Sequence, residues 1–388
     1  MRTQAVATDL VVRTRRVSHT GPLLDLLPAA EDVTSWVRDG EGLVGWGEAA
    51  RVVTGGARRA QEASRWWSQW CRRVRVQDDV RRWGSGPVAF TSMAFADEPG
   101  TSVLVVPRVL AGRRGDVTWI TEVTEPGEEL TPTPTPAPVR SPVGLRYSAD
   151  AHPVHRWRAA VAEAVQRIRA GELEKVVLAR DLLVEAASPI DPRFVLSHLA
   201  ARYPECWCFS VDGLVGATPE MLVRRRGTQI SSRVLAGTTW PRDGVSPAQL
   251  AQDLLASTKD RDEHAFAVAS LVAAMRTVCS QVETDDVQVL ALRNVAHLAT
   301  RVRGVLADPR AWVLDVAAAL HPTAAVGGTP TAAAMALIVE LETMERGRYA
   351  GPVGWVDASG DGELGLALRS AQLDGASARL FAGGGIVA

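Results

Sequence analysis

A lysine heads a very apolar run in "GELEKVVLAR", residues 171–180. If this run is a strand, alternation places Lys175, Val177 and Ala179 on one face. An ammonium beside valine and alanine is partly desolvated, which lowers the pKa of the amine and makes it a possible general base. Lysine is rarely fully buried, so these residues alone favour the other interpretation, a strand-entry lysine that reaches solvent.

A glutamate follows a Gly-x-x-Pro turn in "GATPEMLV", residues 216–223. At the mouth of a strand, the carboxyl of Glu220 would sit in apolar surroundings, and its raised pKa would let it donate a proton near neutral pH. Taken in isolation, an ordinary glutamate at a strand edge is the simpler interpretation.

Two carboxylates, Asp260 and Glu263, lie three residues apart in "STKDRDEHAF", residues 257–266. On a helix they share a face and suit Mg²⁺, which needs only one or two protein carboxylates because it keeps waters or takes substrate oxygens. Alternatively, Ser257 or Asp260 caps the helix and Glu263 forms a surface pair with Lys259.

Arg369 lies in "LGLALRSAQL", where strand alternation places it with Ala367 and Ala371. These small neighbours leave room for a ligand, and the guanidinium fork matches a carboxylate. A strand arginine that extends to solvent fits the same pattern. The glycines of "AGGGIV", residues 382–387, either line an anionic group with their amides or form a plain bulge.

Hydrophobic periodicity predicts the elements that position these residues. Helices are expected over 57–74, over 153–171 with Gly171 as the stop, and over 249–275 with an interruption at Ser257. Two further helices begin at Asp191-Pro192, with Phe194, Val195 and Leu199 inward, and at Thr329-Pro330.

Strands are expected over 102–110, over 116–123, over 220–237 with a turn near Gly227, and over 288–306 with a break near Asn294. The last stretch predicts an antiparallel meander of three strands, "GPVGWVD", "ELGLALRSAQL" and "ARLFAGGGIV". Hairpins and amphipathic helices without regular βαβ alternation favour an α+β fold.

Composition narrows the class of protein. The chain has 388 residues, 46% of them hydrophobic and 22% charged, which is ordinary for a globular protein, and a net charge of −1 attracts neither nucleic acid nor membranes. The amino terminus lacks the apolar core of a signal peptide. Cys206 and Cys208 have the wrong spacing for a zinc or redox motif. A cytoplasmic protein with reduced thiols is expected.

Alternating prolines in residues 128–142 predict an extended connector, or a surface loop, between a strand-rich part over 1–127 and a region over 143–388. The sequence of this stretch is compatible with either a connector or a surface loop. Both parts are expected to belong to one fold.

Several of these motifs, in this order, resemble the chorismate-utilising enzymes, and among them the isochorismate synthases. The resemblance is strong over residues 145–388. It is carried by "EKVVLAR", "GATPEMLV", "LAGTTWPRD", "LLASTKDRDEH", "HLATRVRG", "LHPTAAVGGTP", "YAGPVGWVD", "GDGELGLALRSAQL" and "FAGGGIV". It implies a fold of large, mostly antiparallel sheets packed face to face with helices outside.

The resemblance also implies a reaction and roles for residues. Water adds at C2 of chorismate as the C4 hydroxyl departs, with Mg²⁺ as cofactor. By motif position, Lys175 is the base that activates water, Glu220 is the acid that protonates the leaving hydroxyl, and Glu263 is a magnesium ligand. The positions that align with substrate contacts are Gly237, Thr238, His297, Tyr349, Arg369 and Gly383, and Glu363 lies near them in the motifs.

Within the family, Lys175 favours water over ammonia as the nucleophile, so no glutaminase partner is expected. Ala325 stands where salicylate synthases typically have threonine, which favours stopping at isochorismate, whereas Tyr349 is shared with the salicylate synthases. A monomer is expected, and the pathway, menaquinone or siderophore, stays open.

Family members continue past "GAGIV" with a helix that bears further magnesium carboxylates, whereas this sequence ends at Ala388. The remaining alternative is therefore a shortened homologue that binds chorismate-like anions without turning them over.

Overall fold

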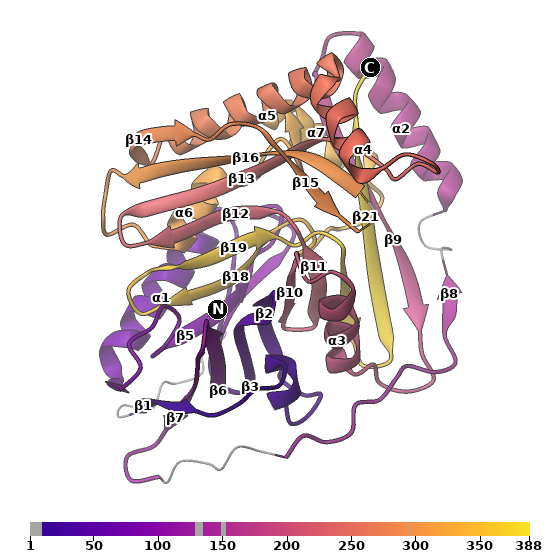
Figure 1. Cartoon of the computed structure of the whole chain (residues 1–388). Helices are drawn as coiled ribbons and strands as arrows, with labels where there is room; N and C mark the ends of the chain where they lie inside the picture. Colours follow the sequence, from indigo (N-terminus) through magenta and orange to yellow (C-terminus); the bar gives the residue numbers. More distant parts are fainter. Residues whose placement is uncertain (1–9, 129–134, 149–152, 294) are drawn as a thin grey trace.

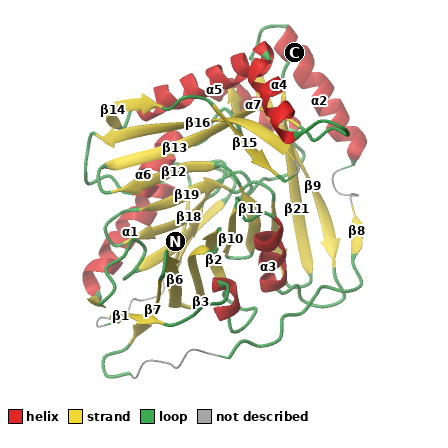
Figure 2. Cartoon of the chain, in the orientation of Figure 1, coloured by secondary structure: helices red, strands yellow, loops and turns green. Residues whose placement is uncertain are grey.

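The computed structural model describes residues 10–128, 135–148, 153–293 and 295–388. Strands dominate it, and seven α-helices lie around them (Figures 1 and 2). The helices of the described ranges are α1 (Arg59–Arg73), α2 (Val154–Arg169), α3 (Pro192–Arg202), α4 (Pro247–Ala256), α5 (Thr258–Met275), α6 (Val313–Leu320) and α7 (Thr331–Leu341), together with a 3₁₀ turn, η1 (Leu23–Leu26).

Strand pairing forms two sheets that share β6 (Thr101–Arg114). The first sheet runs from β4 (Arg75–Asp78) through β1 (Val11–Val17), β7 (Val117–Thr124), β6, β3 (Glu41–Gly55), β2 (Thr34–Arg38), β10 (Trp207–Val211), β11 (Leu214–Thr218), β20 (Ser370–Asp374) and β21 (Ser377–Ile386) to β9 (Lys175–Glu185). β8 (Arg146–Ser148) and β17 (Gly328–Thr329) pair with the outer edge of β9.

The second sheet runs from β6 through β5 (Val88–Ser92), β18 (Pro352–Asp357), β19 (Gly362–Leu366), β12 (Met221–Arg226) and β13 (Gln229–Thr239) to β16 (Val295–Leu306). β14 (Cys279–Thr284) and β15 (Gln288–Leu292) pair with the far edge of β16. Among the described strands, only β1 and β4 pair in parallel. The predicted α+β fold with mostly antiparallel sheets is confirmed.

The two sheets pack face to face through large side chains. Trp36 of β2 and Trp207 of β10, in the first sheet, lie in one buried cluster with Met221 of β12 and Trp355 of β18, in the second. The Trp36 indole nitrogen donates a hydrogen bond to Glu363 of β19, 2.8 Å away, and so joins the sheets directly. α5 and α6 cover the outer face of the second sheet, and α3 packs against β10 and β11 of the first.

Strands from both ends of the chain build these sheets. β2 pairs with β10, and β5 pairs with β18, so the strands of residues 10–124 are joined to those of 146–386 by backbone hydrogen bonds. Residues 129–134 of the predicted connector lie outside the described residues, as does the break at Asn294. Within the described ranges, no helix is long and apolar enough to cross a membrane.

Most of the predicted elements are confirmed. The helix over 57–74 is α1, with Trp66, Trp67 and Trp70 buried, and the helix over 249–275 is divided into α4 and α5 at Ser257. Gly227 turns between β12 and β13 with φ +61°, a conformation that glycine adopts without strain. The helices are predicted from local periodicity and the turn from local backbone geometry. Long-range packing does not alter either of them here.

Two predictions were wrong in detail. The stretch "ELGLALRSAQL" is two strands, β19 and β20, because Arg369 has φ +50° and turns the chain from the second sheet to the first. Alternation therefore does not carry through Ala367 to Ala371. In α3, Arg193 and Leu196 are buried, and Val195 and Leu199 pack against a core cluster as predicted although they are only half-buried. Phe194 instead lies against the exposed His198, with ring centroids 4.0 Å apart.

Candidate active site

Lys175 is the first residue of β9, and its side chain is 17% exposed. The predicted alternation holds, because Ala179 pairs with Gly383 and Val177 with Gly385 in the neighbouring β21 (Figure 1). A Cβ added to Gly385 would lie 3.1 Å from the Cε of Lys175. The lysine side chain thus lies over a glycine-lined part of β21, where there is no side chain to cover it.

Glu263 of α5 is the carboxylate that meets this lysine. Its Oε1 atom lies 3.5 Å from the Lys175 ammonium nitrogen, so the predicted pairing with Lys259 is replaced by a contact between distant segments. Asp260, one turn earlier, instead forms a hydrogen bond with the hydroxyl of Ser257, which caps the helix. The capping interpretation is therefore confirmed for Ser257.

Buried polar contacts hold α5 against the second sheet. One ring nitrogen of His264 lies 3.2 Å from the Ala236 carbonyl, and the other lies 2.8 Å from the Thr300 hydroxyl. Burial lowers the pKa of His264, so the ring is neutral at neutral pH. His264 fixes the helix turn that presents Glu263.

Glu220 lies between β11 and β12, where the chain passes from the first sheet to the second. Burial raises the pKa of its carboxyl to about 7, although the positive charges of Lys175, Arg233 and Arg369 oppose the rise. The Lys175 ammonium is therefore close enough to act on this carboxyl. Arg369 lies at the matching crossing between β19 and β20, and its carbonyl accepts a hydrogen bond from the Ala217 amide, at 3.3 Å.

Thr238 and His297 face each other across β13 and β16, with the threonine oxygen 2.9 Å from the imidazole Nδ1. A bulge at Gly237, with φ +71°, precedes this pair. Burial, assisted by Arg369, lowers the pKa of His297 to about 4, so the ring is neutral at pH 7 and can exchange hydrogen bonds without carrying charge.

Tyr349 is buried and stacked on Phe381 of β21, with ring centroids 4.9 Å apart. A Cβ at Gly383 would lie 3.0 Å from its hydroxyl oxygen, so glycine leaves room for this tyrosine. Burial raises the pKa of Tyr349 to about 12, which keeps the phenol protonated.

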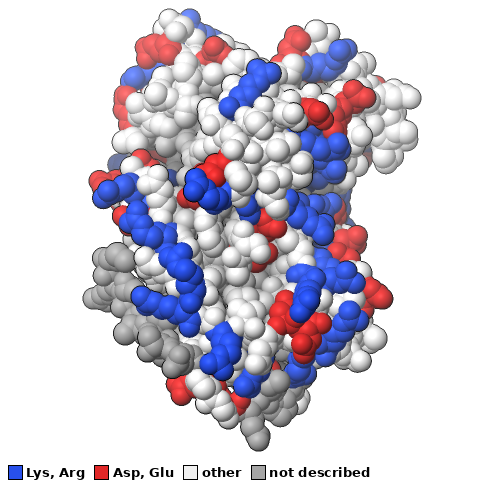
Figure 3. All heavy atoms as spheres, turned by 90° about the vertical axis from the view of Figure 1, so that its left-hand side faces the viewer, with Lys and Arg blue, Asp and Glu red and all other residues white. Residues whose placement is uncertain are grey.

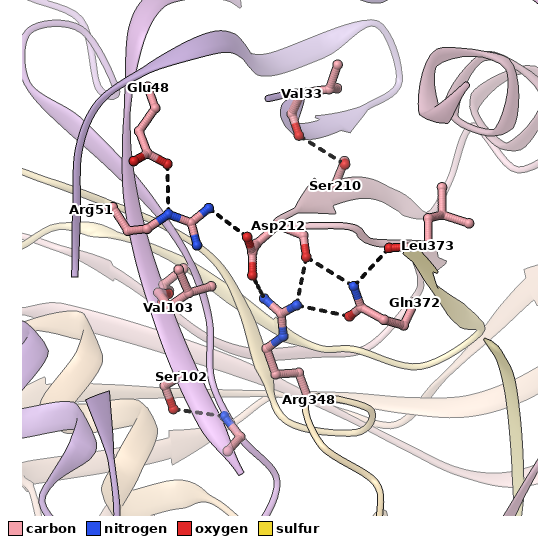
Figure 4. Close-up of polar contacts among 12 residues, drawn as sticks. Val33, Glu48, Arg51, Ser102, Val103, Ser210, Asp212, Arg348, Gln372 and Leu373 are labelled. Carbon is pink, nitrogen blue, oxygen red and sulfur yellow. Dashed lines mark hydrogen bonds and ion pairs between the residues drawn. The ribbon is translucent and has the colours of Figure 1, made fainter. Parts of the chain in front are cut away.

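The residue before it, Arg348, anchors this segment (Figure 4). Its guanidinium lies 2.8 Å from an Asp212 carboxylate oxygen in the β10–β11 turn, and it donates to the side-chain oxygen of Gln372 in β20 at 3.0 Å. Arg51 of β3 reaches the other carboxylate oxygen of Asp212 at 2.6 Å. The β10–β11 turn, which Arg51 of β3 holds in place, and strand β20 thereby fix the start of the segment that carries Tyr349.

A cavity of about 310 Å³ opens beside Glu220 and Ala325. His321 and Thr323 also line it, and both carry a buried side-chain atom without a hydrogen-bond partner among the described residues, Nδ1 and Oγ1. Sequence reasoning missed these two and Arg233, although "LHPTAAVGG" and "SSRVLAG" lay beside residues it selected. Lys175, His297, Tyr349, Arg369 and Gly383 are not among the residues that line this cavity.

Glu363 does not join this group. It is 3% exposed, accepts the Trp36 hydrogen bond and pairs with Arg224, so it lies at the interface between the sheets. No cluster of three or more His, Cys, Asp or Glu side chains suited to a metal occurs in the part of the chain that the structure describes. Glu263 alone fits Mg²⁺ only where water and substrate oxygens complete the coordination.

Comparison with known proteins identifies the family. Residues 100–388 match the family model described as "Chorismate binding enzyme". The chain therefore belongs to the chorismate-binding enzyme family.

Two relatives and one solved structure extend this finding. Isochorismate synthase DhbC of Bacillus subtilis is 39% identical over 246 residues, which are 60% of this chain and 62% of that protein. A Mycobacterium tuberculosis protein, named as a candidate isochorismate synthase MenF, is 36% identical over 81% of this chain and 84% of its own. The menaquinone-specific isochorismate synthase MenF of Escherichia coli shares the fold, with a TM-score of 0.79 at 24% identity, over 99% of this chain and 91% of its own.

Proposed function

We propose that this chain converts chorismate to isochorismate by adding water at C2 as the C4 hydroxyl leaves. The observation that carries the proposal is the carboxyl of Glu220, whose pKa near 7 is held up by burial while the ammonium of Lys175 acts on it from nearby. A base and an acid on either side of a ring are what this substitution needs. The names of the relatives, isochorismate synthases, support the same reaction.

In this proposal Lys175 takes a proton from water, and Glu220 gives a proton to the departing hydroxyl oxygen. Arg369 binds a substrate carboxylate, while Thr238, neutral His297, Tyr349 and the amide of Gly383 orient the ring. Glu263 would hold Mg²⁺, which supplies positive charge to neutralise a second substrate carboxylate. Because Glu263 otherwise pairs with Lys175, engaging it elsewhere would also release the lysine to act as a base.

The basic residues of the chain support a special role for Lys175. Lysine and arginine total 43, yet only Lys175 and Lys259 are lysines. Arginine cannot give up its proton in a protein, whereas lysine can. A chain that otherwise uses arginine thus keeps a lysine at the position where a base is needed.

Chorismate consumption and product formation, measured by chromatography with and without Mg²⁺, test this proposal. Lys175→Ala and Lys175→Arg should each lower kcat by about 10²- to 10⁴-fold, the usual contribution of a general base. Lys259→Ala is the matched control, because Lys259 is exposed on α5, and it should keep full activity.

If Lys175→Arg retained water addition, Lys175 would not be the base. Salicylate and pyruvate as the main products would instead indicate a salicylate synthase. This outcome is worth testing because Tyr349 is shared with the salicylate synthases. Binding of chorismate without turnover would point to a non-catalytic homologue.

A further inference from the structure

Six arginines surround a second cavity, of about 260 Å³, whose lining includes no aspartate or glutamate. They are Arg38, Arg224, Arg226, Arg233, Arg301 and Arg303. Alternation explains the position, because Ile230 and Val234 of β13 pack toward α5 and the helix layer, which leaves Ser231 and Arg233 on the opposite face. The cavity thus lies on the face of the second sheet that is turned away from α5.

Four of the six arginines have no ion-pair partner among the described residues, although Glu363 acts on Arg38, and Glu220 on Arg233, from a longer distance. Arg224 pairs with Glu363, and Arg303 lies 2.8 Å from Asp285. Arg38, Arg226, Arg233 and Arg301 form no ion pair with any residue in the described ranges. Moreover, Arg233 stands directly opposite Arg301 in the β13–β16 register, and like charges in that position destabilise a sheet.

An aromatic side chain holds two of these guanidinium groups in place. The Arg38 guanidinium lies 4.4 Å from the ring centroid of Trp207, and that of Arg233 lies 5.1 Å from it. Burial, and next the charge of Arg38, lower the pKa of Arg233 to about 10. Stacking on Trp207 thus holds the guanidinium groups of Arg38 and Arg233 close together, but it supplies no negative charge to neutralise them.

We propose that this cavity binds a small oxyanion with at least two negative charges, a phosphate-type anion or a dicarboxylate. Guanidinium forks suit both because each offers parallel donors to paired oxygens. Figure 3, which faces the left-hand side of Figure 1, shows Lys and Arg side chains gathered in a band on this side of the molecule, where the β12–β13 turn lies. An anion here would relieve the repulsion between Arg233 and Arg301.

The proposed anion site is separate from the catalytic group. It uses neither Lys175 nor Arg369, and it meets the cavity beside Glu220 only through the shared lining residues Met221, Ser232 and Arg233. Arg226 and Arg301 line the arginine cavity but not the cavity beside Glu220, so substitutions at these two positions test the anion site specifically.

Thermal unfolding of the full chain tests the site with two probes, pyrophosphate and succinate, each against sodium chloride at the same ionic strength. We expect at least one probe to raise the Tm of the unaltered chain by several degrees at a hundredfold excess over its Kd. Arg226→Gln combined with Arg301→Gln should raise the Kd of that probe at least tenfold and remove the Tm response.

Arg310→Gln is the control, since Arg310 is an exposed arginine on a surface turn, and it should respond like the unaltered chain. Without anion, the double variant should unfold at the same or a higher temperature, because it loses a repulsion. Which probe acts identifies the class of anion.

An equal Tm response in the double variant, or no response beyond that of sodium chloride, would overturn the proposal. So would loss of the response in Arg369→Gln alone, because the probe would then be bound at the catalytic group. None of these outcomes depends on whether the chain turns over chorismate.

Discussion

At the residue scale, Glu220 has the environment of a proton donor. Its carboxyl is removed from water at a crossing between the sheets, and the resulting rise in pKa outweighs the pull of three nearby cations. A carboxyl with a pKa near 7 is still partly protonated at neutral pH. It can therefore release a proton in the range where an enzyme works.

Glu220→Gln separates this chemical role from a structural one. We expect kcat to fall about 10²- to 10⁴-fold, because glutamine cannot donate the proton. For the unaltered chain, kcat/KM should fall as the pH rises through about 7, since the acid form is lost there. Initial rates of chorismate loss between pH 5.5 and 9 measure both effects.

Glu220→Gln should lower the activity but raise the thermal stability of the chain at high pH. A carboxyl whose pKa is raised in the folded state favours folding below its unfolded pKa of about 4.5, and this advantage is lost as the pH rises through 7. Glu220→Gln should therefore match the unaltered chain in Tm at pH 4 and exceed it at pH 8. A lower Tm at both pH values would mean that Glu220 is a structural ion-pair partner.

At the element scale, a buried ion pair joins the segments that carry Lys175 and Ala325. Arg346 donates to the Val326 carbonyl at 2.8 Å and to the Val177 carbonyl at 2.6 Å. Glu342 pairs with Arg346 and also accepts the Ala179 amide, at 2.8 Å. The 321–327 loop and β9 are thus held together through one guanidinium.

Loss of the Glu342–Arg346 pair should destabilise the folded chain, because both the 321–327 loop and β9 are held by it. Glu342→Ala leaves a buried guanidinium without its carboxylate and should lower the free energy of unfolding by about 3–5 kcal/mol. Urea unfolding measures the loss, with Glu163→Ala of the exposed Glu163–Arg167 pair as control, expected within about 1 kcal/mol. Equal losses in the two variants would show that the buried pair does not clamp these segments.

At the scale of the whole molecule, the two sheets are joined by β6 and by polar contacts across their shared core. The hydrogen bond from Trp36 to Glu363 is one such contact, and Arg224 holds the second carboxylate oxygen at 2.5 Å. Loss of the indole donor would leave part of a buried charge unsatisfied. Such a loss costs more than the packing change alone.

Two tryptophan-to-phenylalanine substitutions isolate this contribution. Trp36→Phe should destabilise the chain by about 1.5–3 kcal/mol more than Trp119→Phe, because its donor serves a charged acceptor. Trp119 is as deeply buried, but its indole nitrogen has no partner among the described residues. Equal midpoints in urea for the two variants would contradict a bridging role for Glu363.

The sequence alone determined the local elements and the family. Helices such as α1 and α5, and the face shared by Lys175, Val177 and Ala179, follow from periodicity, which each segment carries by itself. The order of the motifs was sufficient to predict the family to which residues 100–388 belong. It also selected Lys175 and Glu220, although neither residue was decisive in isolation.

Only the tertiary structure decided how these residues meet. The left-handed turn at Arg369 moves the chain between sheets, and no alternation pattern marks it. Glu263 pairs with Lys175 instead of its neighbour Lys259, and Glu363 turns inward to Trp36, because partners far apart in the chain compete with local ones. The partner of each side chain depends on contacts between segments that are far apart in the sequence, and the pattern within one segment does not specify those contacts.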